Sequence, residues 1–336
     1  MSLTGALLLV IVLEVLLRLI GPPAVRFKLA EKQLHCLSDN LVVLCPDRQV
    51  TFQHPLGFDY TITTNATGDR ITADEDSNSA EQLWIAGDSI ALGYGVNDAE
   101  SAAYLLADDP RMQPLSVRNL GVDALGSGGI HKHLTGRMDR NRIHPAAIYW
   151  IFHASDFLDD VRDEQRARST WRRLLFVWQF RLSRYSAILN LIKYMLEEHA
   201  GAEAPNQHAG APVRAQPESG SGAESFQIAD DHPTIRNLKK MFADMRERDI
   251  PLILVFYPEV NHATGLPSQT YPEKRAILRL AESHGVRTLN LADSFYAAAP
   301  TEDLYIPVDG HPAVDAQIIF AEAIARDSRR YRTIPQ

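Results

Sequence analysis

Residues 83–96 read LWIAGDSIALGYGV, a short apolar run that ends in small residues. Such a run is typical of a buried strand that ends in a tight turn. Ser89 lies at the end of this predicted strand. Ligands of open parallel sheets bind beside the carboxyl ends of the strands, so a serine at this point can present its hydroxyl to a cleft. Gly-Asp-Ser is also a common turn sequence, and the stretch by itself fits both interpretations.

The chain beyond Ser89 alternates strand-like apolar runs with helical stretches. We predict further strands at 117–121, 146–152, 251–257 and 287–291. Strands that alternate with helices indicate a parallel sheet covered by helices on both faces. The sequence therefore predicts an α/β protein with a three-layer, flavodoxin-like fold and a central parallel five-stranded sheet. The first strand of such a sheet is central and ends at the topological switch point.

A second motif lies near the C-terminus. Residues 305–312 read YIPVDGHP and precede a helical pattern at 313–327. A nucleophilic serine needs a base that accepts its proton and a third group that orients this base. Asp309 and His311 are side chains of these two types. We therefore predict a catalytic triad of Ser89 as nucleophile, His311 as base and Asp309 as the orienting group.

Gly-Asp-Ser at 87–89, the run GYGVND at 93–98 and the Asp-Gly-His block at 309–311 resemble the SGNH/GDSL hydrolases, in particular their membrane-anchored bacterial branch. The resemblance covers about residues 83 to 328. It implies ester chemistry at Ser89 without a cofactor. It also implies an oxyanion hole of three donors: the backbone N–H of the nucleophile, the backbone N–H of a glycine after the second strand, and an asparagine side chain after the third strand.

The second and third donor positions of the family are altered in this chain. With Asn119 aligned on the family pattern, the family's glycine falls at Ala124, whose backbone N–H can still donate if φ allows. The family's Gly-x-Asn-Asp block corresponds to HASD at 153–156, so the hydroxyl of Ser155 replaces an amide. We predict donors at Ser89, Ala124 and Ser155, with Gly121 and His153 as the alternatives.

Residues 3–20 are apolar apart from Thr4, Gly5, Glu14 and Arg18, and Gly-Pro-Pro at 21–23 ends the predicted helix. Its length is close to the minimum for crossing a bilayer. Glu14 and Arg18 are one turn apart near its end, where they can pair or extend to the interface. We predict a membrane anchor over 1–23. An amphipathic or buried helix and the apolar part of a signal sequence are the alternatives.

Two indications of membrane orientation disagree. The basic residues after the helix place the globular part in the cytoplasm by the positive-inside rule; they are Arg18, Arg26, Lys28 and Lys32. The family resemblance implies the opposite, a catalytic domain in the periplasm. The only two cysteines, Cys36 and Cys45, are nine positions apart. We predict a disulfide between them, which would form in an oxidising compartment.

We divide the chain into an anchor over 1–23, an N-terminal extension over 24–80 and a catalytic domain over 81–330. The extension contains short strand-like runs such as 41–44 and 60–64. These runs are separated by Gly, Asn and Asp turns. No motif in the extension indicates chemistry.

The predicted catalytic domain carries an insertion over 157–230. Residues 171–198 mix aromatic and aliphatic side chains with arginine at helical spacing. We predict a helix that packs on the domain, with a lid or a helix on a membrane surface as alternatives. Residues 200–225 are rich in Ala, Gly, Pro and Ser, which predicts a flexible loop.

The formal net charge of -8 and the pI near 5.8 argue against a nucleic-acid partner, because phosphate recognition needs a concentrated basic patch. We interpret the local cluster Arg166, Arg168, Arg172 and Arg173 as a solvated helix face.

No metal site is predicted. The two cysteines have only His35 beside them as a further ligand, which is too few for structural zinc. His131 and His133 should point to different faces of a helix, and we expect both at the surface.

The leading hypothesis is a serine esterase or acyltransferase of the cell envelope, acting on an ester-bearing small molecule or on the O-acetyl groups of a glycan, the substrate class that the family branch implies. Two alternatives remain. Ala124 and Ser155 would suit a binding module that keeps the cleft and has lost efficient turnover. The aromatic residues at 171–180 would suit a hydrolase of lipids or thioesters.

Overall fold

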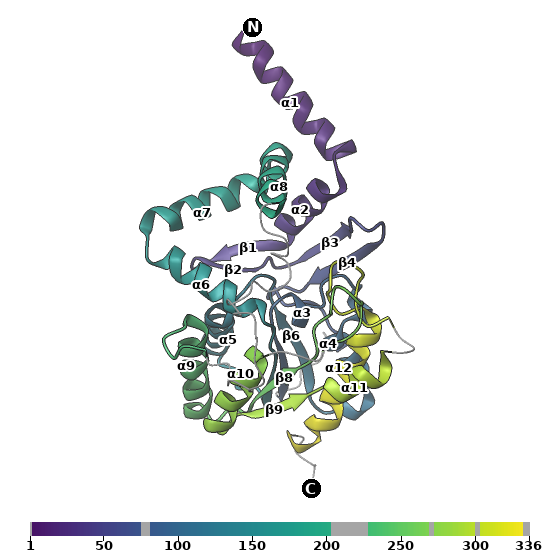
Figure 1. Ribbon diagram of the computed structural model, residues 1–336, viewed down its shortest axis with the longest axis vertical. Helices are drawn as coiled ribbons and strands as arrows, with labels where there is room; N and C mark the ends of the chain where they lie inside the picture. The colour runs from purple at the N-terminus through teal and green to yellow at the C-terminus, as the bar shows by residue number, and fades with distance from the viewer. Residues whose placement is uncertain (1, 75–80, 203–227, 269–271, 300–302, 332–336) are drawn as a thin grey trace, which may run out of the picture. The chain divides into compact units, whose positions relative to one another are not determined.

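Figure 1 shows a computed structural model of the protein, and the structure describes residues 2–74, 81–202, 228–268, 272–299 and 303–331. The chain divides into two compact units. The N-terminal unit comprises residues 1–68 and 165–211, and the sheet unit comprises residues 69–164 and 212–336.

The sheet unit is built on a five-stranded parallel sheet of order β6-β5-β7-β8-β9. Its strands are β5 (Gln82–Gly87), β6 (Ser116–Gly121), β7 (Ala147–Ile151), β8 (Leu252–Phe256) and β9 (Arg287–Asn290). In chain order this is 2-1-3-4-5, the flavodoxin-like arrangement whose switch point lies beside the first strand. The predicted fold class is therefore confirmed, and the four predicted strands after Ser89 match β6 to β9 within two residues at either end.

The central strands are buried along their length because helices cover both faces of the sheet (Figure 1). Ile85, Tyr149 and Val255 on neighbouring strands are fully buried in one core cluster. In this unit α4 packs on α12, and α5 packs on α9. The helices are α3 (Ser89–Leu92), α4 (Ala102–Asp108), α5 (Ser127–Asn141), α6 (Ser155–Ala167), α9 (Pro233–Glu247), α10 (Pro272–Ser283), α11 (Ala292–Ala298) and α12 (Val314–Asp327), with 3-10 turns at Asp98–Glu100, Pro110–Met112 and Ser328–Tyr331.

The expectation that His131 and His133 lie at the surface is wrong. Both side chains are buried on α5, His131 on the side that packs against α9 and His133 near Asp69. His131 Nε2 lies 2.8 Å from a carboxylate oxygen of Asp244 on α9. Burial lowers the pKa of His133 to about 4, so this ring is neutral at physiological pH.

The N-terminal unit consists of helices and two β-hairpins. Its elements are α1 (Leu3–Ile20), α2 (Pro23–Leu34), β1 (His35–Ser38), β2 (Leu41–Leu44), β3 (Arg48–Gln53), β4 (Asp59–Thr64), α7 (Thr170–Ser183) and α8 (Ala187–Ala202). The bounds of α1 and β2 are those predicted. The strands pair antiparallel, β1 with β2 and β3 with β4.

The insertion predicted at 157–230 contributes α7 and α8 to this unit, as two helices where we predicted one. The chain breaks before α8 because Ser186 Oγ caps the new helix, accepting the N–H of Leu189 at 3.2 Å. The predicted flexible loop at 200–225 lies, from residue 203 on, outside the described residues.

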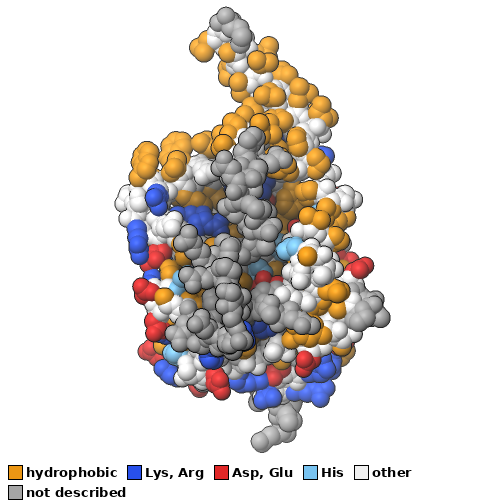
Figure 2. Space-filling view, in the orientation of Figure 1, with side chains coloured by type: hydrophobic (Ala, Val, Ile, Leu, Met, Phe, Trp, Pro, Cys, Tyr) orange, Lys and Arg blue, Asp and Glu red, His pale blue; other side chains and the backbone are white. Residues whose placement is uncertain are grey.

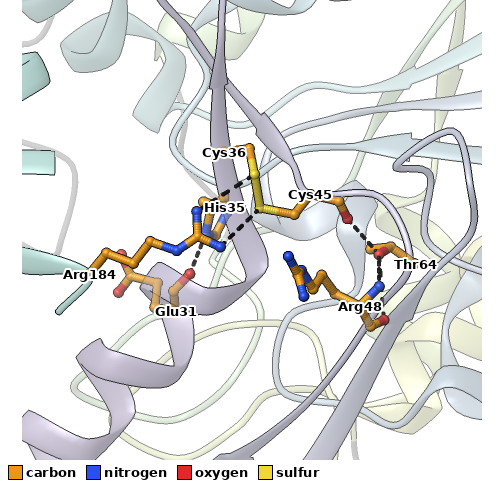
Figure 3. The surroundings of a disulfide bond; sticks show 7 residues. All are labelled: Glu31, His35, Cys36, Cys45, Arg48, Thr64 and Arg184. Carbon is orange, nitrogen blue, oxygen red and sulfur yellow. Dashed lines mark hydrogen bonds between the residues drawn. A yellow bond between two sulfur atoms is a disulfide. The ribbon is translucent and has the colours of Figure 1, made fainter. Parts of the chain in front are cut away.

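The predicted disulfide between Cys36 and Cys45 is confirmed, with a Cα–Cα separation of 5.0 Å (Figure 3). It links β1 to the residue that follows β2. Arg184, from the segment between α7 and α8, places one terminal nitrogen 3.8 Å from each sulfur. Thr64 Oγ1 on β4 donates to the carbonyl of Cys45 at 2.6 Å. The disulfide therefore joins both hairpins and the α7–α8 segment at one point.

Candidate active site

Ser89 is the first residue of α3, and only Asp88 separates it from the end of the central strand β5. Asp88 caps the helix, and its Oδ1 accepts the N–H of Ile90 at 2.9 Å. Gly87 has φ of +146°, and a Cβ there would lie 2.7 Å from the carbonyl oxygen of Ile151 on β7. The close approach of β5 and β7 thus requires glycine, and the turn after it carries the serine hydroxyl out of the sheet.

The loop before α12 brings His311 to this serine. His311 Nε2 lies 2.9 Å from Ser89 Oγ. The other ring nitrogen, Nδ1, is hydrogen-bonded to Asp309 Oδ1, which also accepts the backbone N–H of His311 at 3.1 Å. The loop is closed by the N–H of Ile306, which donates to the carbonyl of His311 at 2.8 Å. The structure thus brings together the three residues predicted as a triad, in the order serine, histidine, aspartate.

Carboxylates around His311 determine its protonation. Burial lowers the pKa of His311, but the hydrogen bond and charge of Asp309, with the charges of Asp123 and Asp88, outweigh it, and the pKa is raised above its ordinary value. The imidazole is therefore a stronger base than a free histidine. It accepts a proton from Ser89 readily once it is itself deprotonated.

Sequence reasoning missed Arg70, whose fully buried guanidinium holds the loop that follows α3. The side chain donates to Leu92 O (2.8 Å), Gly93 O (2.6 Å), Val96 O (2.7 Å) and Asp98 Oδ1 (3.0 Å). The same loop carries Tyr94, whose ring centroid lies 5.4 Å from that of His311. Arg70 lies outside every recognisable motif, and no sequence signal relates it to Ser89.

The second predicted oxyanion donor, Ala124, has φ of +57° and an exposed side chain. This left-handed conformation favours glycine, which agrees with an alignment that places the family's glycine here. Gly121, the alternative, donates its N–H to Asn119 Oδ1 at 3.0 Å. A Cβ at Gly121 would lie 2.2 Å from the backbone nitrogen of Leu92, so this glycine serves the packing of α3 on β6.

The third predicted donor, Ser155, is engaged by its neighbours. Its hydroxyl donates to Asp88 Oδ2 at 2.9 Å and lies 2.7 Å from His153 Nδ1. His153 Nδ1 also accepts the N–H of Ser155 at 3.2 Å, and His153 Nε2 lies 3.6 Å from Glu259 Oε1. Glu259, which the sequence did not single out, accepts the N–H of Ala154 at 3.2 Å. These contacts tie the end of β7 to the residue that precedes the nucleophile.

A small hollow lies beside this network and holds about 20 Å³. Burial lowers the pKa of Lys274 in its wall to about 8, an effect that the charge of Glu259 partly offsets. The hollow is lined by Phe152, Ala154, Phe256, Tyr257, Glu259, Glu273 and Lys274.

No family model and no curated protein matches this chain. Solved structures do match it. TesA shares 15% identity over 75% of this chain and 100% of its own, with a TM-score of 0.42. The lipase/acylhydrolase from Enterococcus faecalis shares 15% over 76% and 99%, with a TM-score of 0.44.

A further match is a member of the lipolytic G-D-S-L family from Veillonella parvula, at 10% identity over 73% of this chain and 97% of its own, with a TM-score of 0.41. This is the family that the sequence motifs resemble. At identities and TM-scores this low, the assignment of an activity to this chain rests on its own residues.

Proposed function

We propose that the chain is a serine esterase or acyltransferase of the SGNH/GDSL type. Ser89 is the nucleophile, His311 the general base and acid, and Asp309 the group that orients His311. The observation that carries the proposal is the contact of 2.9 Å between His311 Nε2 and Ser89 Oγ, with Asp309 hydrogen-bonded to the opposite ring nitrogen.

The proposed reaction has two steps. Ser89 Oγ attacks the ester carbonyl while its proton passes to His311 Nε2. The imidazolium then protonates the departing alcohol and leaves an acyl group on Ser89. In the second step water or an acceptor hydroxyl gives its proton to His311 and takes the acyl group, and His311 returns the proton to Ser89 Oγ as the bond between Ser89 and the acyl group breaks. The carboxylate of Asp309 stabilises the imidazolium in both steps.

Backbone N–H groups are the proposed main donors to the oxyanion. The N–H of Ser89 lies at the start of α3, and Ala124 has a left-handed backbone conformation of the kind that favours glycine, the residue that the family resemblance implies here. One such donor contributes about 3 kcal/mol of transition-state stabilisation. Ser155 can donate to the oxyanion only by giving up its hydrogen bond to Asp88, since a hydroxyl has one proton. We therefore propose that Ser155 chiefly positions Asp88.

For the substrate we propose an acetyl ester of a cell-envelope glycan. The resemblance to the membrane-anchored branch of the family supports this class.

We further propose that α1 anchors the protein in a membrane and that the sheet unit lies on the extracytoplasmic side, in the periplasm. The helix is long and apolar enough to cross a bilayer, with a mean hydropathy of 2.5. The disulfide favours the oxidising side of the membrane, and so does the family resemblance. The basic residues that follow α1 indicate the opposite orientation by the positive-inside rule.

Two observations favour other functions. The engagement of Ser155 by Asp88 would suit a binding module with little turnover. The exposed tryptophans of α7, Trp171 and Trp178, would suit a hydrolase of lipids or thioesters.

A fluorophosphonate probe tests the proposal, because only an activated serine reacts with it. The detergent-solubilised full chain should be labelled, and the Ser89→Ala variant should not. An unlabelled wild type would support the binding module and overturn the proposed chemistry. Turnover of acetyl and long-chain aryl esters then distinguishes the substrate classes, since a preference for long chains would favour a lipid hydrolase.

A further inference from the structure

Helix α7 exposes a continuous apolar stripe. Its side chains recur at the spacing of one helix face and are 47 to 73% exposed: Trp171, Leu174, Leu175, Trp178 and Leu182. The start of α8 carries a second stripe, formed by Leu189, Ile192, Met195 and Leu196. The opposite face of these helices is packed within the N-terminal unit, where Phe180 and Ala187 are buried. Large side chains at this spacing and exposure indicate a contact surface.

The start of α8 is fixed to α1 by the two charged residues of that apolar helix. The Glu14 carboxylate accepts the backbone N–H groups of Ala187 (2.6 Å) and Ile188 (3.2 Å). Arg18 pairs with Glu14 at 2.9 Å and donates to the carbonyl of Tyr185 at 2.6 Å. Glu14 thereby caps the N-terminus of α8. The charged groups of Glu14 and Arg18 both find polar partners where α1 contacts the turn between α7 and α8.

This attachment sets the depth of the turn relative to α1. Glu14 lies six residues before Ile20, the last residue of α1, which is about 9 Å along the helix axis. If α1 crosses the bilayer, the turn lies within about 10 Å of the end from which the chain leaves the helix. Interfacial helices bury their apolar faces about 5–10 Å into the boundary between headgroups and acyl chains. The stripe on α7 therefore begins at the depth that such helices occupy.

The charge of α7 fits an anionic lipid surface. The helix carries Arg172, Arg173 and Arg181, all exposed, and no acidic residue. Figure 2 shows hydrophobic side chains gathered over α1 and over α7, with basic side chains beside those of α7. Tryptophan and tyrosine are the residues that favour the headgroup region, and Tyr185 at the turn is 72% exposed.

We propose that residues 170–196, which we call the membrane hairpin, lie in the headgroup region of the anionic bilayer that α1 enters, with the two exposed stripes turned into the lipid. The proposal rests on the proposed anchoring by α1. It gives Glu14 and Arg18 a defined role, because a salt bridge inside an apolar helix is costly unless both groups find further partners.

The tryptophans allow a direct test. Of the four in the chain, Trp84 and Trp150 are buried within the central sheet, and Trp171 and Trp178 are exposed on the hairpin. The full chain is reconstituted into vesicles of phosphatidylcholine and phosphatidylglycerol, with bromine on the acyl chains near the headgroup. Bromine should quench about half of the emission relative to unbrominated vesicles, because the two hairpin rings then lie at its depth.

Matched variants complete the test. A Trp171→Phe/Trp178→Phe double variant keeps the apolar face and should show no bromine quenching. Leu174→Asp/Leu175→Asp keeps the tryptophans and should lose at least about half of the quenching, because the acidic groups repel the anionic surface. Leu56→Asp, at an exposed apolar residue between β3 and β4, is the control and should leave the quenching unchanged.

Three outcomes would overturn the proposal. If the protein floats with the vesicles but acrylamide in the water quenches its tryptophans and bromine does not, the hairpin is in solvent while the anchoring stands. If the protein does not float with the vesicles at all, the proposed anchoring fails and the hairpin proposal fails with it. If neither quencher acts and cross-linking joins two hairpins, a second copy of the chain covers the stripes.

Discussion

The two sides of the candidate active site are built on different principles. On one side, Ser89, His311 and Asp309 make the contacts that proton transfer needs. On the other side, the predicted oxyanion donor Ser155 is bonded to Asp88 and lies beside His153. Proton transfer demands particular side chains, whereas an oxyanion hole needs N–H groups in a given direction, which many residue types can offer. Side chains on the second side are therefore free to take structural roles.

The strongest test of the first side is removal of Ser89 or His311. Ser89→Ala and His311→Ala should each lower kcat by on the order of 10⁵–10⁶-fold, and the double variant should lose little more, because the two act as one unit. Both side chains are only partly buried, so circular dichroism and the melting temperature should change little. If the loss of kcat in the double variant equals the product of the two single losses, the two residues act independently and do not form a catalytic pair.

Asp309→Asn tests the group that orients the base. We expect kcat to fall by about 10³–10⁴-fold, because the amide favours the wrong tautomer of His311. Wild-type kcat/KM should fall as the pH drops through an apparent pKa above about 6.5, since carboxylates raise the pKa of His311 and only its neutral form accepts a proton. In the variant this limb should move to lower pH. A pH–rate profile that Asp309→Asn leaves unshifted would contradict the assigned role.

Arg70→Met tests what holds the nucleophile's loop. The variant leaves the carbonyls of Gly93 and Val96 without the guanidinium that donates to them and removes one of two donors to the carbonyl of Leu92. We expect a loss of about 3–5 kcal/mol in the free energy of unfolding, measured with urea. Arg330→Met is the matched control, since the Arg330 side chain is 67% exposed, and should change stability by less than about 0.5 kcal/mol. If Arg70→Met and Arg330→Met lower the free energy of unfolding equally, Arg70 does not hold the loop that follows α3.

The sheet could be predicted from the sequence, because β5, β7 and β8 are short apolar runs and all five strands alternate with helical stretches. The bounds of α1 followed from Gly21 and the two prolines after it. The contact of Ser89 with His311 and of His311 with Asp309 could also be predicted, since Gly-Asp-Ser and Asp-Gly-His are recognisable blocks. All of these signals are local in the chain.

The features that the sequence did not predict depend on contacts between distant segments. Arg70 contacts residues more than twenty positions away. Glu259 accepts the backbone N–H of Ala154, which is more than a hundred positions away. The same reason explains α7 and α8, which were expected within the catalytic domain. Glu14 and Arg18, which contact the start of α8 and Tyr185 before it, are more than 160 positions away along the chain.

Ser155 tests the second side of the site directly. If its hydroxyl positions Asp88, Ser155→Ala removes one hydrogen bond of about 1 kcal/mol and should lower kcat on an acetyl ester by about fivefold to tenfold. A loss of about 100-fold or more would show that the hydroxyl itself donates to the oxyanion. Ser155→Asn should then restore or raise kcat, because its amide reaches further. If His153→Ala causes the large loss instead, the donor role passes to His153.

The smallest effect is expected at Ala124, where the proposed oxyanion role needs a backbone N–H and a left-handed residue but no particular side chain. A non-glycine residue in this conformation costs about 1 kcal/mol, so Ala124→Gly relieves strain while it adds freedom to the unfolded chain. We expect the free energy of unfolding to change by between zero and about 1 kcal/mol in the stabilising direction, and kcat to stay within about twofold, because the N–H keeps its direction. Ala124→Val is the opposing control, since a β-branched side chain at φ of +57° should destabilise the turn and lower kcat together with stability. A kcat that falls in Ala124→Gly while stability holds would mean that the methyl group contacts the substrate. The oxyanion side of the site would then depend on a particular side chain, as the side formed by Ser89, His311 and Asp309 does.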